Sequence, residues 1–299
     1  MIADERPAGR VEAARTPAPW AAARRAPARP ALGVLLAAST ATAPAAPAPR
    51  QVEATREPEQ PVIEELFLGE LAFPQEALEL QIASAPAWRR RGRLVRFSIP
   101  LQLELGLTDR LQIGGELPLE LVRDDRGVAA GPGVLRAEAL YSFLDDRALG
   151  LTISAGIEAG FPAGSRELGA PGYALEPFVS VHKSFGAVHL CLSASAEVTL
   201  PVARSDATEI GPGVALAAVL PAGDLAPTVE LAVELDDATS LRFAPGVRWH
   251  PARGLELGAA LSLGREGDAP ELGLLLLVTK EIQLGDDDVP ERESGRRSP

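Results

Sequence analysis

Residues 96–105, Arg-Phe-Ser-Ile-Pro-Leu-Gln-Leu-Glu-Leu, alternate between polar and apolar side chains. Apolar side chains hold the odd positions from 97 to 105, and polar or charged ones hold most of the even positions. Successive side chains of a strand point to opposite faces, so a period of two residues is the pattern of a β-strand with one apolar face. The stretch therefore predicts a strand and not a helix.

The same alternation returns about a dozen times before Lys280. So many one-sided strands need either a second sheet or a lipid bilayer against their apolar faces. We therefore predict an all-β fold, an antiparallel up-and-down transmembrane β-barrel of about 12 strands. The predicted strands are 77–89, 94–106, 111–122, 131–143, 148–161, 173–183, 187–199, 211–221, 226–235, 240–250, 255–264 and 270–280.

The predicted connections fall into two classes. Every second one is brief, whereas the loops 123–130, 162–172 and 201–210 are longer and irregular. Short turns on one rim and long loops on the other are typical of bacterial outer-membrane barrels, whose short rim faces the periplasm.

Two hairpins predict a register. A three-residue turn places Leu101 opposite Leu117, and a two-residue loop at Phe185-Gly186 places His182 opposite His189. Two stretches, 214–220 and 272–278, are apolar on both parities, and their orientation stays open.

Aromatic residues on the apolar parity lie mostly near strand ends, where aromatic girdles of membrane barrels sit. Phe178 is the exception to this parity. The aromatic residues on the apolar parity are Trp88, Phe97, Tyr141, Phe143, Phe161, Tyr173, Phe243 and Trp249.

The first part of the chain has a different composition. Residues 1–45 are rich in Ala, Pro and Arg, with an apolar stretch at 31–38 and a small-x-small sequence at 43–45. This pattern resembles a secretory signal cleaved after Ala45, and a disordered tail is the alternative. We expect a periplasmic lead-in over 46–75, the barrel over 76–284 and a charged disordered tail over 285–299.

Charge argues against nucleic acid as a partner. The chain carries a net charge of -12. The first 45 residues contribute +3, so residues 46–299 carry -15. A protein that binds nucleic acid would present a basic surface.

The polar parity of the strands carries 12 Glu and 4 Arg, a net charge of -8. Unpaired buried charges are costly, so we expect these side chains to line a wet lumen that prefers cations. The solvated outer face of a soluble sandwich is the alternative. The predicted lumen-lining residues are Glu79, Arg96, Glu104, Glu116, Glu120, Arg136, Glu138, Glu158, Glu176, Glu197, Glu230, Glu234, Arg242, Arg248, Glu256 and Glu271.

No catalytic, cofactor-binding or metal site is predicted. Cys191 is the single cysteine, which excludes an intramolecular disulfide and a CxxC zinc site. His182, His189 and Cys191 are the one grouping with metal-ligand chemistry, but neighbours on a flat hairpin rarely converge on one ion. We predict that the protein is not an enzyme.

Several short sequences carry a family resemblance. They include Ser98-Ile99-Pro100-Leu101, Gly106-Leu107-Thr108-Asp109-Arg110-Leu111 and Phe161-Pro162-Ala163-Gly164-Ser165. Over about residues 65–280 the chain resembles the outer-membrane β-barrel family labelled for the meta-pathway of phenol degradation, whose members are often called transporters. The resemblance implies a barrel in the bacterial outer membrane. A Glu-rich lumen suits phenolate anions poorly, and the chain ends in a charged tail instead of a strand ending in Phe.

The expected function is a passive channel or uptake pore for small molecules in the bacterial outer membrane, with lipid and small solutes as its partners. Two alternatives remain at this stage: a non-conducting structural or adhesion-type barrel, and a soluble periplasmic β protein.

Overall fold

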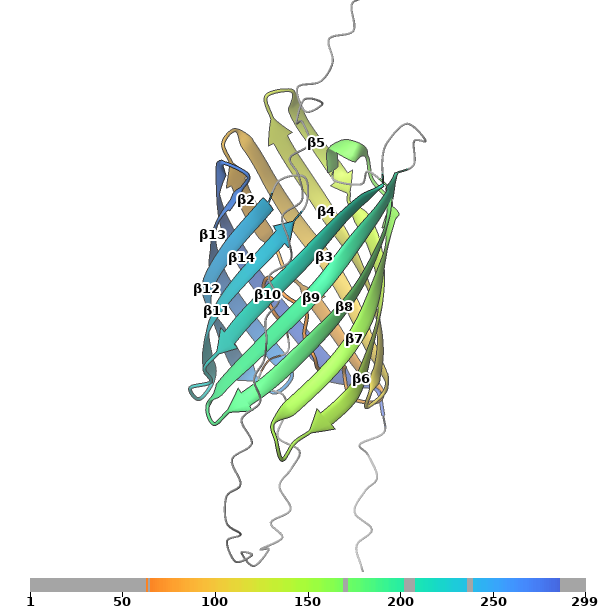
Figure 1. The fold of residues 1–299 in the computed structure, drawn as a ribbon, viewed down its shortest axis with the longest axis vertical. Helices are drawn as coiled ribbons and strands as arrows, with labels where there is room; N and C mark the ends of the chain where they lie inside the picture. Colours follow the sequence, from red (N-terminus) through yellow and green to blue (C-terminus); the bar gives the residue numbers. More distant parts are fainter. Residues whose placement is uncertain (1–62, 64, 169–171, 202–207, 236–238, 286–299) are drawn as a thin grey trace, which may run out of the picture. The chain divides into compact units, whose positions relative to one another are not determined.

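The computed structural model describes residue 63 and residues 65–168, 172–201, 208–235 and 239–285. These residues form an antiparallel sheet of tilted strands rolled into a barrel (Figure 1). The elements are β1 (Glu79–Ser84), β2 (Ala87–Arg91), β3 (Leu94–Thr108), β4 (Leu111–Asp124), β5 (Gly127–Pro132), β6 (Val134–Asp146), β7 (Leu151–Pro162), the 3-10 turn η1 (Arg166–Leu168), β8 (Gly172–Phe185), β9 (Val188–Pro201), β10 (Glu209–Val219), β11 (Leu225–Leu235), β12 (Thr239–Ala252), β13 (Leu255–Glu266) and β14 (Ala269–Gln283).

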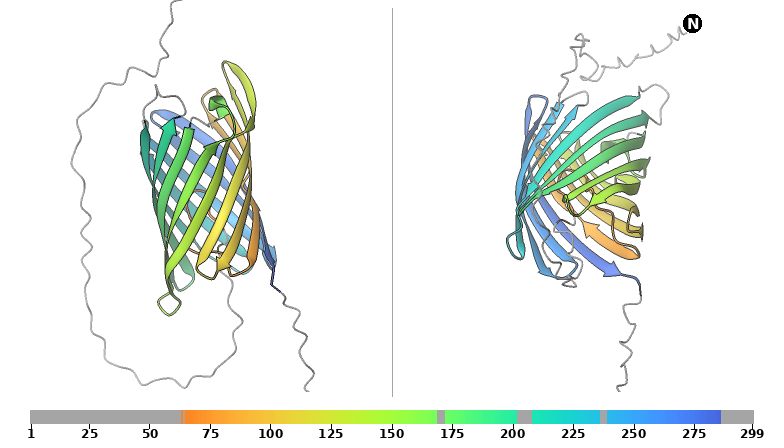
Figure 2. Two further views of the ribbon diagram at one scale, coloured as in Figure 1. Left: turned by 90° about the vertical axis from the view of Figure 1, so that its right-hand side faces the viewer. Right: turned by 60° about the horizontal axis from the view of Figure 1, so that its bottom comes forward.

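The sheet closes on itself. β1 and β2 follow one another along the same two neighbours, β3 and β14, and β5 and β6 follow one another along β4. The 14 strands of the sheet therefore make a barrel 12 strands around, in which each strand pairs with the next along the chain and the last with the first. Figure 2 shows the closed wall from two sides. The predicted fold class is confirmed.

One predicted loop is instead part of a hairpin. Residues 123–130 were expected to be irregular, but β4 continues to Asp124 and β5 begins at Gly127. Asp124 Oδ1 accepts the N–H groups of Arg126 and Gly127 at 2.7 and 3.2 Å, and Gly127 adopts a φ of 143°. This side-chain turn lets the hairpin extend beyond its neighbours.

Exposure alternates along the strands as the sequence pattern predicts. In β11, Val229 and Leu231 are 45% and 40% exposed, whereas Thr228 and Glu230 are 3% and 1% exposed. The outer surface is thus apolar and the polar side chains point inward, the reverse of a soluble protein. In the described part of the chain, no helix has the length and apolar character needed to cross a membrane.

One of the two predicted registers is correct. Leu101 pairs with Leu117 as expected. At the other hairpin the loop is Gly186-Ala187, so that Phe185 pairs with Val188 and His182 lies opposite Cys191 instead of His189. Gly186 takes the left-handed conformation with a φ of 62°, which keeps Phe185 in the strand and moves the turn by one residue. The resulting shift of two positions in the pairing leaves every side chain on its predicted face.

The expected aromatic positions face outward. Seven of the eight are exposed, among them Tyr141 at 48% and Trp249 at 48%, and Trp88 is half-buried. Phe161 and Tyr173 form an edge-to-face pair with ring centroids 6.3 Å apart. Phe178 points inward and lies over Gly156, where an added Cβ would come within 2.2 Å of the ring.

The core lies inside the barrel, where residues preceding β1 occupy the lumen. We call Ile63 and residues 65–77 the lumen loop. Its buried apolar members, Ile63, Leu66 and Ala72, are 1%, 7% and 0% exposed. The described end of the segment expected as a lead-in thus lies within the barrel and not ahead of it, while residues 46–62 and 64 fall outside the described residues.

Candidate functional site

The lumen loop enters and leaves the barrel at the same rim. Ile63 packs in a cluster with Val219 and Ala226, which flank the short turn between β10 and β11. The loop then approaches the wall near the middle of β10, where an added Cβ on Gly69 would lie 3.0 Å from the Ala215 Cβ. It returns to Leu78, whose N–H donates to Gly106 O at 2.8 Å beside the turn between β3 and β4. The loop therefore fills the half of the lumen nearest the rim of short turns.

A buried ionic network holds the loop at its first bend. The Glu230 carboxylate accepts the N–H groups of Phe67 and Leu68 at 3.0 and 2.7 Å. It also accepts a hydrogen bond from Arg248 Nη2 at 3.1 Å. Arg248, 0% exposed, lies 4.9 Å from the centre of the Phe67 ring and forms an ion pair with Glu256 at 3.2 Å. The second oxygen of Glu256 lies 3.0 Å from His250 Nε2.

Serines on three consecutive strands pair with the backbone of the loop. Ser154 Oγ donates to Ala72 O, and Ser180 Oγ donates to Glu70 O at 2.8 Å. The Glu70 N–H donates to Ser193 Oγ at 3.3 Å. A non-helical segment inside a barrel has no strand partner, so these hydroxyls satisfy backbone groups that would otherwise be buried without hydrogen bonds.

Glutamines hold the last part of the loop. The Gln75 N–H donates to Gln112 Oε1 at 2.8 Å, and its side-chain amide donates to Glu104 at 3.3 Å. A cavity of about 20 Å³, lined by Gln75, Glu104 and Glu138 among others, is the space left beside this part of the loop. That volume is close to one water molecule.

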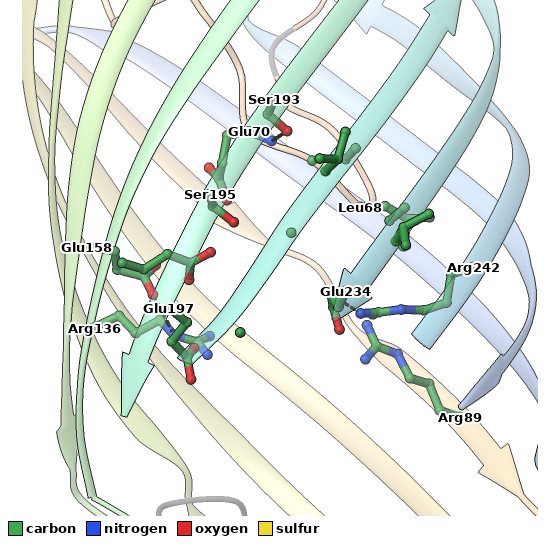
Figure 3. A pocket seen from close by; sticks show the side chains of 18 residues that line it. Leu68, Glu70, Arg89, Arg136, Glu158, Ser193, Ser195, Glu197, Glu234 and Arg242 are labelled. Carbon is green, nitrogen blue, oxygen red and sulfur yellow. Dashed lines mark hydrogen bonds and ion pairs between the residues drawn. The ribbon is translucent and has the colours of Figure 1, made fainter. Parts of the chain in front are cut away.

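A larger cavity of about 410 Å³ lies on the other side of the loop, and we call it the vestibule. Its strand residues, such as Glu158, Glu197 and Glu234, come from the strand ends nearest the long loops. The space exists partly because the inward positions of β10 are Gly211, Gly213 and Ala215, which project little or no side chain. Figure 3 shows charged side chains on either side of this strand.

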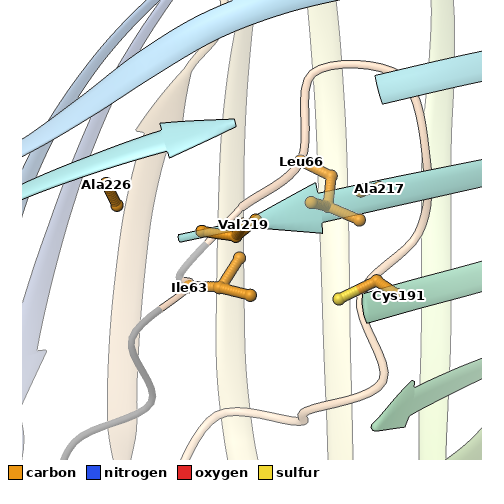
Figure 4. Packing of buried hydrophobic residues seen from close by; sticks show 6 residues of the cluster. All are labelled: Ile63, Leu66, Cys191, Ala217, Val219 and Ala226. Atoms are coloured by element: carbon orange, nitrogen blue, oxygen red, sulfur yellow. The ribbon is translucent and has the colours of Figure 1, made fainter. Parts of the chain in front are cut away.

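Apolar inward residues explain the two strands that the sequence left ambiguous. In β14, Leu274 and Leu276 are exposed, whereas Leu275 and Leu277 are 4% and 2% exposed and point inward. Leu275 belongs to an apolar cluster with Ala244 and Ala260, and Phe67 and Leu68 of the loop pack against this cluster. On β10 the inward residues Ala217 and Val219 pack against Ile63 and Leu66 (Figure 4). Each of these two strands is apolar on both faces because its outer face meets lipid and its inner face meets the loop.

The residues predicted to line the lumen separate into groups. Most of them contact the vestibule, the loop or one another inside the barrel, and Glu79 lies at the short-turn rim, where it accepts the Glu76 N–H at 3.1 Å. The vestibule holds Arg136, Glu158, Glu176, Glu197, Glu234 and Arg242. The network under the loop holds Glu230, Arg248 and Glu256, and the small cavity holds Glu104 and Glu138. The Glu116 carboxylate forms an ion pair with Arg136 at 3.2 Å, and the Glu120 carboxylate accepts a hydrogen bond from the Ser98 hydroxyl at 2.8 Å. The last two residues are placed by strand pairing: Arg96 lies opposite Val122, and Glu271 lies opposite Arg91.

Sequence reasoning missed Arg89 and the whole lumen loop. Arg89 lines the vestibule from β2. The strand alternation predicts an inward position for Arg89, because the preceding residue, Trp88, lies on the outward apolar face. The loop gave no strand period, and its partners on the wall are single serine, glutamine and glutamate side chains on different strands, which carry no distinctive pattern.

His182 and His189 meet, whereas Cys191 turns elsewhere. His182 Nε2 lies 3.0 Å from His189 Nδ1. Cys191 packs in the apolar cluster with Ile63 and Leu66. Across the described residues, no group of three or more potential metal ligands was found.

Comparison with known proteins identifies the fold. No protein-family model and no curated protein matches the sequence. An outer-membrane channel from Pseudomonas putida F1 is similar in structure, with a TM-score of 0.59 and 16% identity over 71% of this chain and 98% of that one. The NanC porin gives a TM-score of 0.51 and 10% identity over 67% of this chain and 100% of that one.

The fold is that of outer-membrane channels and porins. Both neighbours are covered almost completely, so the whole barrel and not a part of it is shared. The phenol meta-pathway label of the family resemblance stays a prediction.

Proposed function

We propose that this protein is a passive channel for small solutes in the bacterial outer membrane, closed on one side by its own lumen loop. The observation that carries the proposal is the charged vestibule of about 410 Å³ inside a barrel whose outer surface is apolar. Eight-stranded barrels are filled by side chains and 16-stranded porins hold an aqueous channel, so a barrel of 12 strands has room for a narrow passage. No catalytic group is needed for this function.

The outer surface favours a membrane barrel over a soluble periplasmic protein. Exposed apolar side chains such as Leu101, Leu119 and Val214, at 56%, 58% and 50%, belong to different strands of the wall. A soluble protein exposes contiguous apolar patches of only a few hundred Å². Lipid is the environment that such a wall fits.

Location has a direct test. The mature protein is expected in the outer-membrane fraction, and its apparent mass on a denaturing gel is expected to shift when the sample is boiled, because intact barrels resist detergent. Recovery in the soluble periplasm without such a shift would refute the membrane assignment. Peptide mass spectrometry of the same sample checks the predicted cleavage after Ala45.

The tightly held loop also favours a second candidate, a structural barrel that does not conduct. Planar-bilayer recordings separate the two. A channel is expected to give discrete current steps, smaller than those of a 16-stranded porin, and larger ones once the loop is released. If neither the wild type nor a loop-released variant conducts, while both shift on the gel, the structural barrel is the correct function.

A further inference from the structure

The vestibule separates positive and negative charge onto two walls. Four carboxylates, those of Glu70, Glu158, Glu176 and Glu197, gather around one guanidinium on one side. Two guanidinium groups, Arg89 and Arg242, gather around Glu234 on the other side. Between them the strand carries Gly211 and Gly213, so no side chain divides the space. Figure 3 shows both groups facing the same cavity.

The acidic wall has more negative charge than its own arginine can neutralise. Arg136 binds Glu158 at 2.9 Å and, outside the vestibule, Glu116 at 3.2 Å. The Glu197 carboxylate accepts a hydrogen bond from the Thr199 hydroxyl at 2.8 Å, and the Glu176 carboxylate accepts one from the Ser195 hydroxyl. A cation placed here would compensate carboxylates that only neutral hydroxyls now contact.

The basic wall has an unpaired guanidinium. Arg242 is bound to Glu234. Arg89 forms neither a hydrogen bond nor an ion pair with any described residue, although its Nε is buried. Figure 3 shows the Arg89 guanidinium pointing toward Arg242 and Glu234 at the edge of the cavity. A buried donor without an acceptor is costly, and an incoming carboxylate would satisfy it, because the planar fork of arginine matches a carboxylate in two hydrogen bonds.

We propose that the vestibule binds a small zwitterionic solute, with its ammonium group on the Glu158–Glu176–Glu197 wall and its carboxylate on Arg89. The volume of about 410 Å³ lies within the range of small-molecule sites. The proposal deepens the proposed function, because the vestibule lies between the rim of long loops and the lumen loop and is therefore the part of the channel that a solute reaches first from that rim.

Isothermal titration calorimetry of the full-length barrel in detergent tests the site without requiring conduction. The probes are the zwitterion 6-aminohexanoate and two ions with the same six-carbon chain, hexanoate, which has only the carboxylate, and hexylammonium, which has only the ammonium group. We expect 6-aminohexanoate to bind about tenfold more tightly than either ion, since it alone engages both walls. Glycine and 4-aminobutyrate then report the spacing that the two walls prefer. Equal affinities for the zwitterion and the two ions would refute the proposal.

Two variants assign the ends of the ligand. Arg89→Gln is expected to lower the affinity for 6-aminohexanoate about tenfold and leave that for hexylammonium unchanged. Glu176→Gln is expected to lower the affinities for 6-aminohexanoate and for hexylammonium and to leave the affinity for hexanoate unchanged. Arg90→Gln is the matched control, because Arg90 is the next residue of β2 and is exposed on the opposite face. The same loss with Arg90→Gln, or no loss with Arg89→Gln, would overturn the assignment.

Folding and conduction are read separately. Heat-modifiability on a gel confirms that each variant is a barrel, and Arg89→Lys, which keeps the charge without the fork, replaces Arg89→Gln if the latter does not fold. Binding without current steps in bilayers would support the site and refute the channel. Current steps without a preference for the zwitterion would support the channel and refute the site.

Discussion

Glu230 connects the barrel wall to the loop inside it. One carboxylate, 1% exposed, accepts two loop N–H groups and one guanidinium donor. Buried carboxylates are tolerated when they are paired and hydrogen-bonded, and the loss of one partner leaves the other charge uncompensated. The seat of the lumen loop therefore depends strongly on this single side chain.

Glu230→Ala is expected to release the first bend of the loop. Removing one member of a buried ion pair costs about 3–5 kcal/mol, enough to favour loop withdrawal over the loss of the barrel. In planar bilayers the variant is expected to show larger current steps than the wild type. Val229→Ala on the same strand is the control, because Val229 is 45% exposed on the outer face. Unchanged current steps in Glu230→Ala, with the barrel intact, would show that this network does not hold the loop.

Gly106 allows the chain to pass the wall where the loop becomes β1. A Cβ at this position would lie 1.9 Å from Glu76 O, a backbone atom that cannot move independently. Gly106→Ala is therefore expected to destabilise the barrel by about 1–3 kcal/mol or to displace the end of the loop. Gly115→Ala on the next strand is the control, since its nearest new contact would be Arg136 O at 3.5 Å.

The midpoint temperature of the gel shift measures the effect. A lower midpoint for Gly106→Ala than for Gly115→Ala is expected. Equal midpoints would mean that the chain passes the wall at a greater distance than in this structure.

At the scale of elements, the lumen loop is fixed to the wall through polar contacts and two small apolar clusters. It has no strand pairing of its own, so it can move without opening the hydrogen-bonded ladders of the wall. The loop is therefore the element whose position should decide between a closed and an open lumen.

A disulfide between loop and wall tests this directly. Gly69→Cys and Ala215→Cys, combined with Cys191→Ser, place two Cβ atoms about 3.0 Å apart, slightly closer than the usual disulfide spacing. The oxidised double-cysteine protein is expected to show the smallest current steps. Reduction of the disulfide is expected to restore the larger steps of the protein that was never oxidised. The single variant Gly69→Cys in the same background controls for the mutation itself. Steps that do not respond to oxidation, with the crosslink verified by mass spectrometry, would mean that ions pass without movement of the loop.

The elements also show what the sequence could predict. The hairpin after β3 turns at Asp109-Arg110, one residue shorter than predicted, but a register shift between Gly106 and Thr108 compensates, so the prediction that Leu101 faces Leu117 is correct. The hairpin after β8 depends on which residue takes a left-handed conformation, and Phe185-Gly186 and Gly186-Ala187 are equally compatible with the alternation. The lumen loop was not predictable, because its position depends on contacts with strands more than 100 residues away, such as that between Leu68 and Glu230.

At the scale of the whole molecule, the charge of the lumen should select ions. The predicted lumen face carries 12 Glu and 4 Arg, and the structure adds Arg89 and Glu70 to it. Negative walls concentrate cations, so reversal potentials in a salt gradient are expected to show a preference for cations.

The double change Glu116→Gln and Glu120→Gln is expected to weaken that preference. Both side chains are inward, but Glu116 forms an ion pair with Arg136, whereas Glu120 accepts a hydrogen bond from the neutral Ser98. The double change is therefore expected to remove more uncompensated negative charge from the lumen than Glu116→Gln alone. The single variant serves as the comparison. Selectivity for anions, or a reversal potential that the double change does not move, would contradict the predicted role of this face.

The strands could be predicted from alternation, and the barrel from alternation together with the short and long connections, because lipid imposes the same requirement on every strand: an apolar side chain outside at every second position. The interior obeys no such single rule. Leu275 and Leu277 are inward and apolar, and Gly211 and Gly213 are inward and bare, because of the loop and the cavity that they border. Inward positions are therefore explained by their particular neighbours, which only the three-dimensional arrangement supplies.

The seam between β1 and β14 has a consequence for the order of assembly. It pairs Glu79 with Gln283, residues of the first and last strands of the barrel, so the barrel can close only after its last strand is available. The lumen loop ends at residue 77, two residues before β1 begins, and is carried to its place by the strand that closes the seam. Closing the wall and filling the interior are thus one late kinetic event, and a nascent barrel would remain wide open along its side until that event takes place.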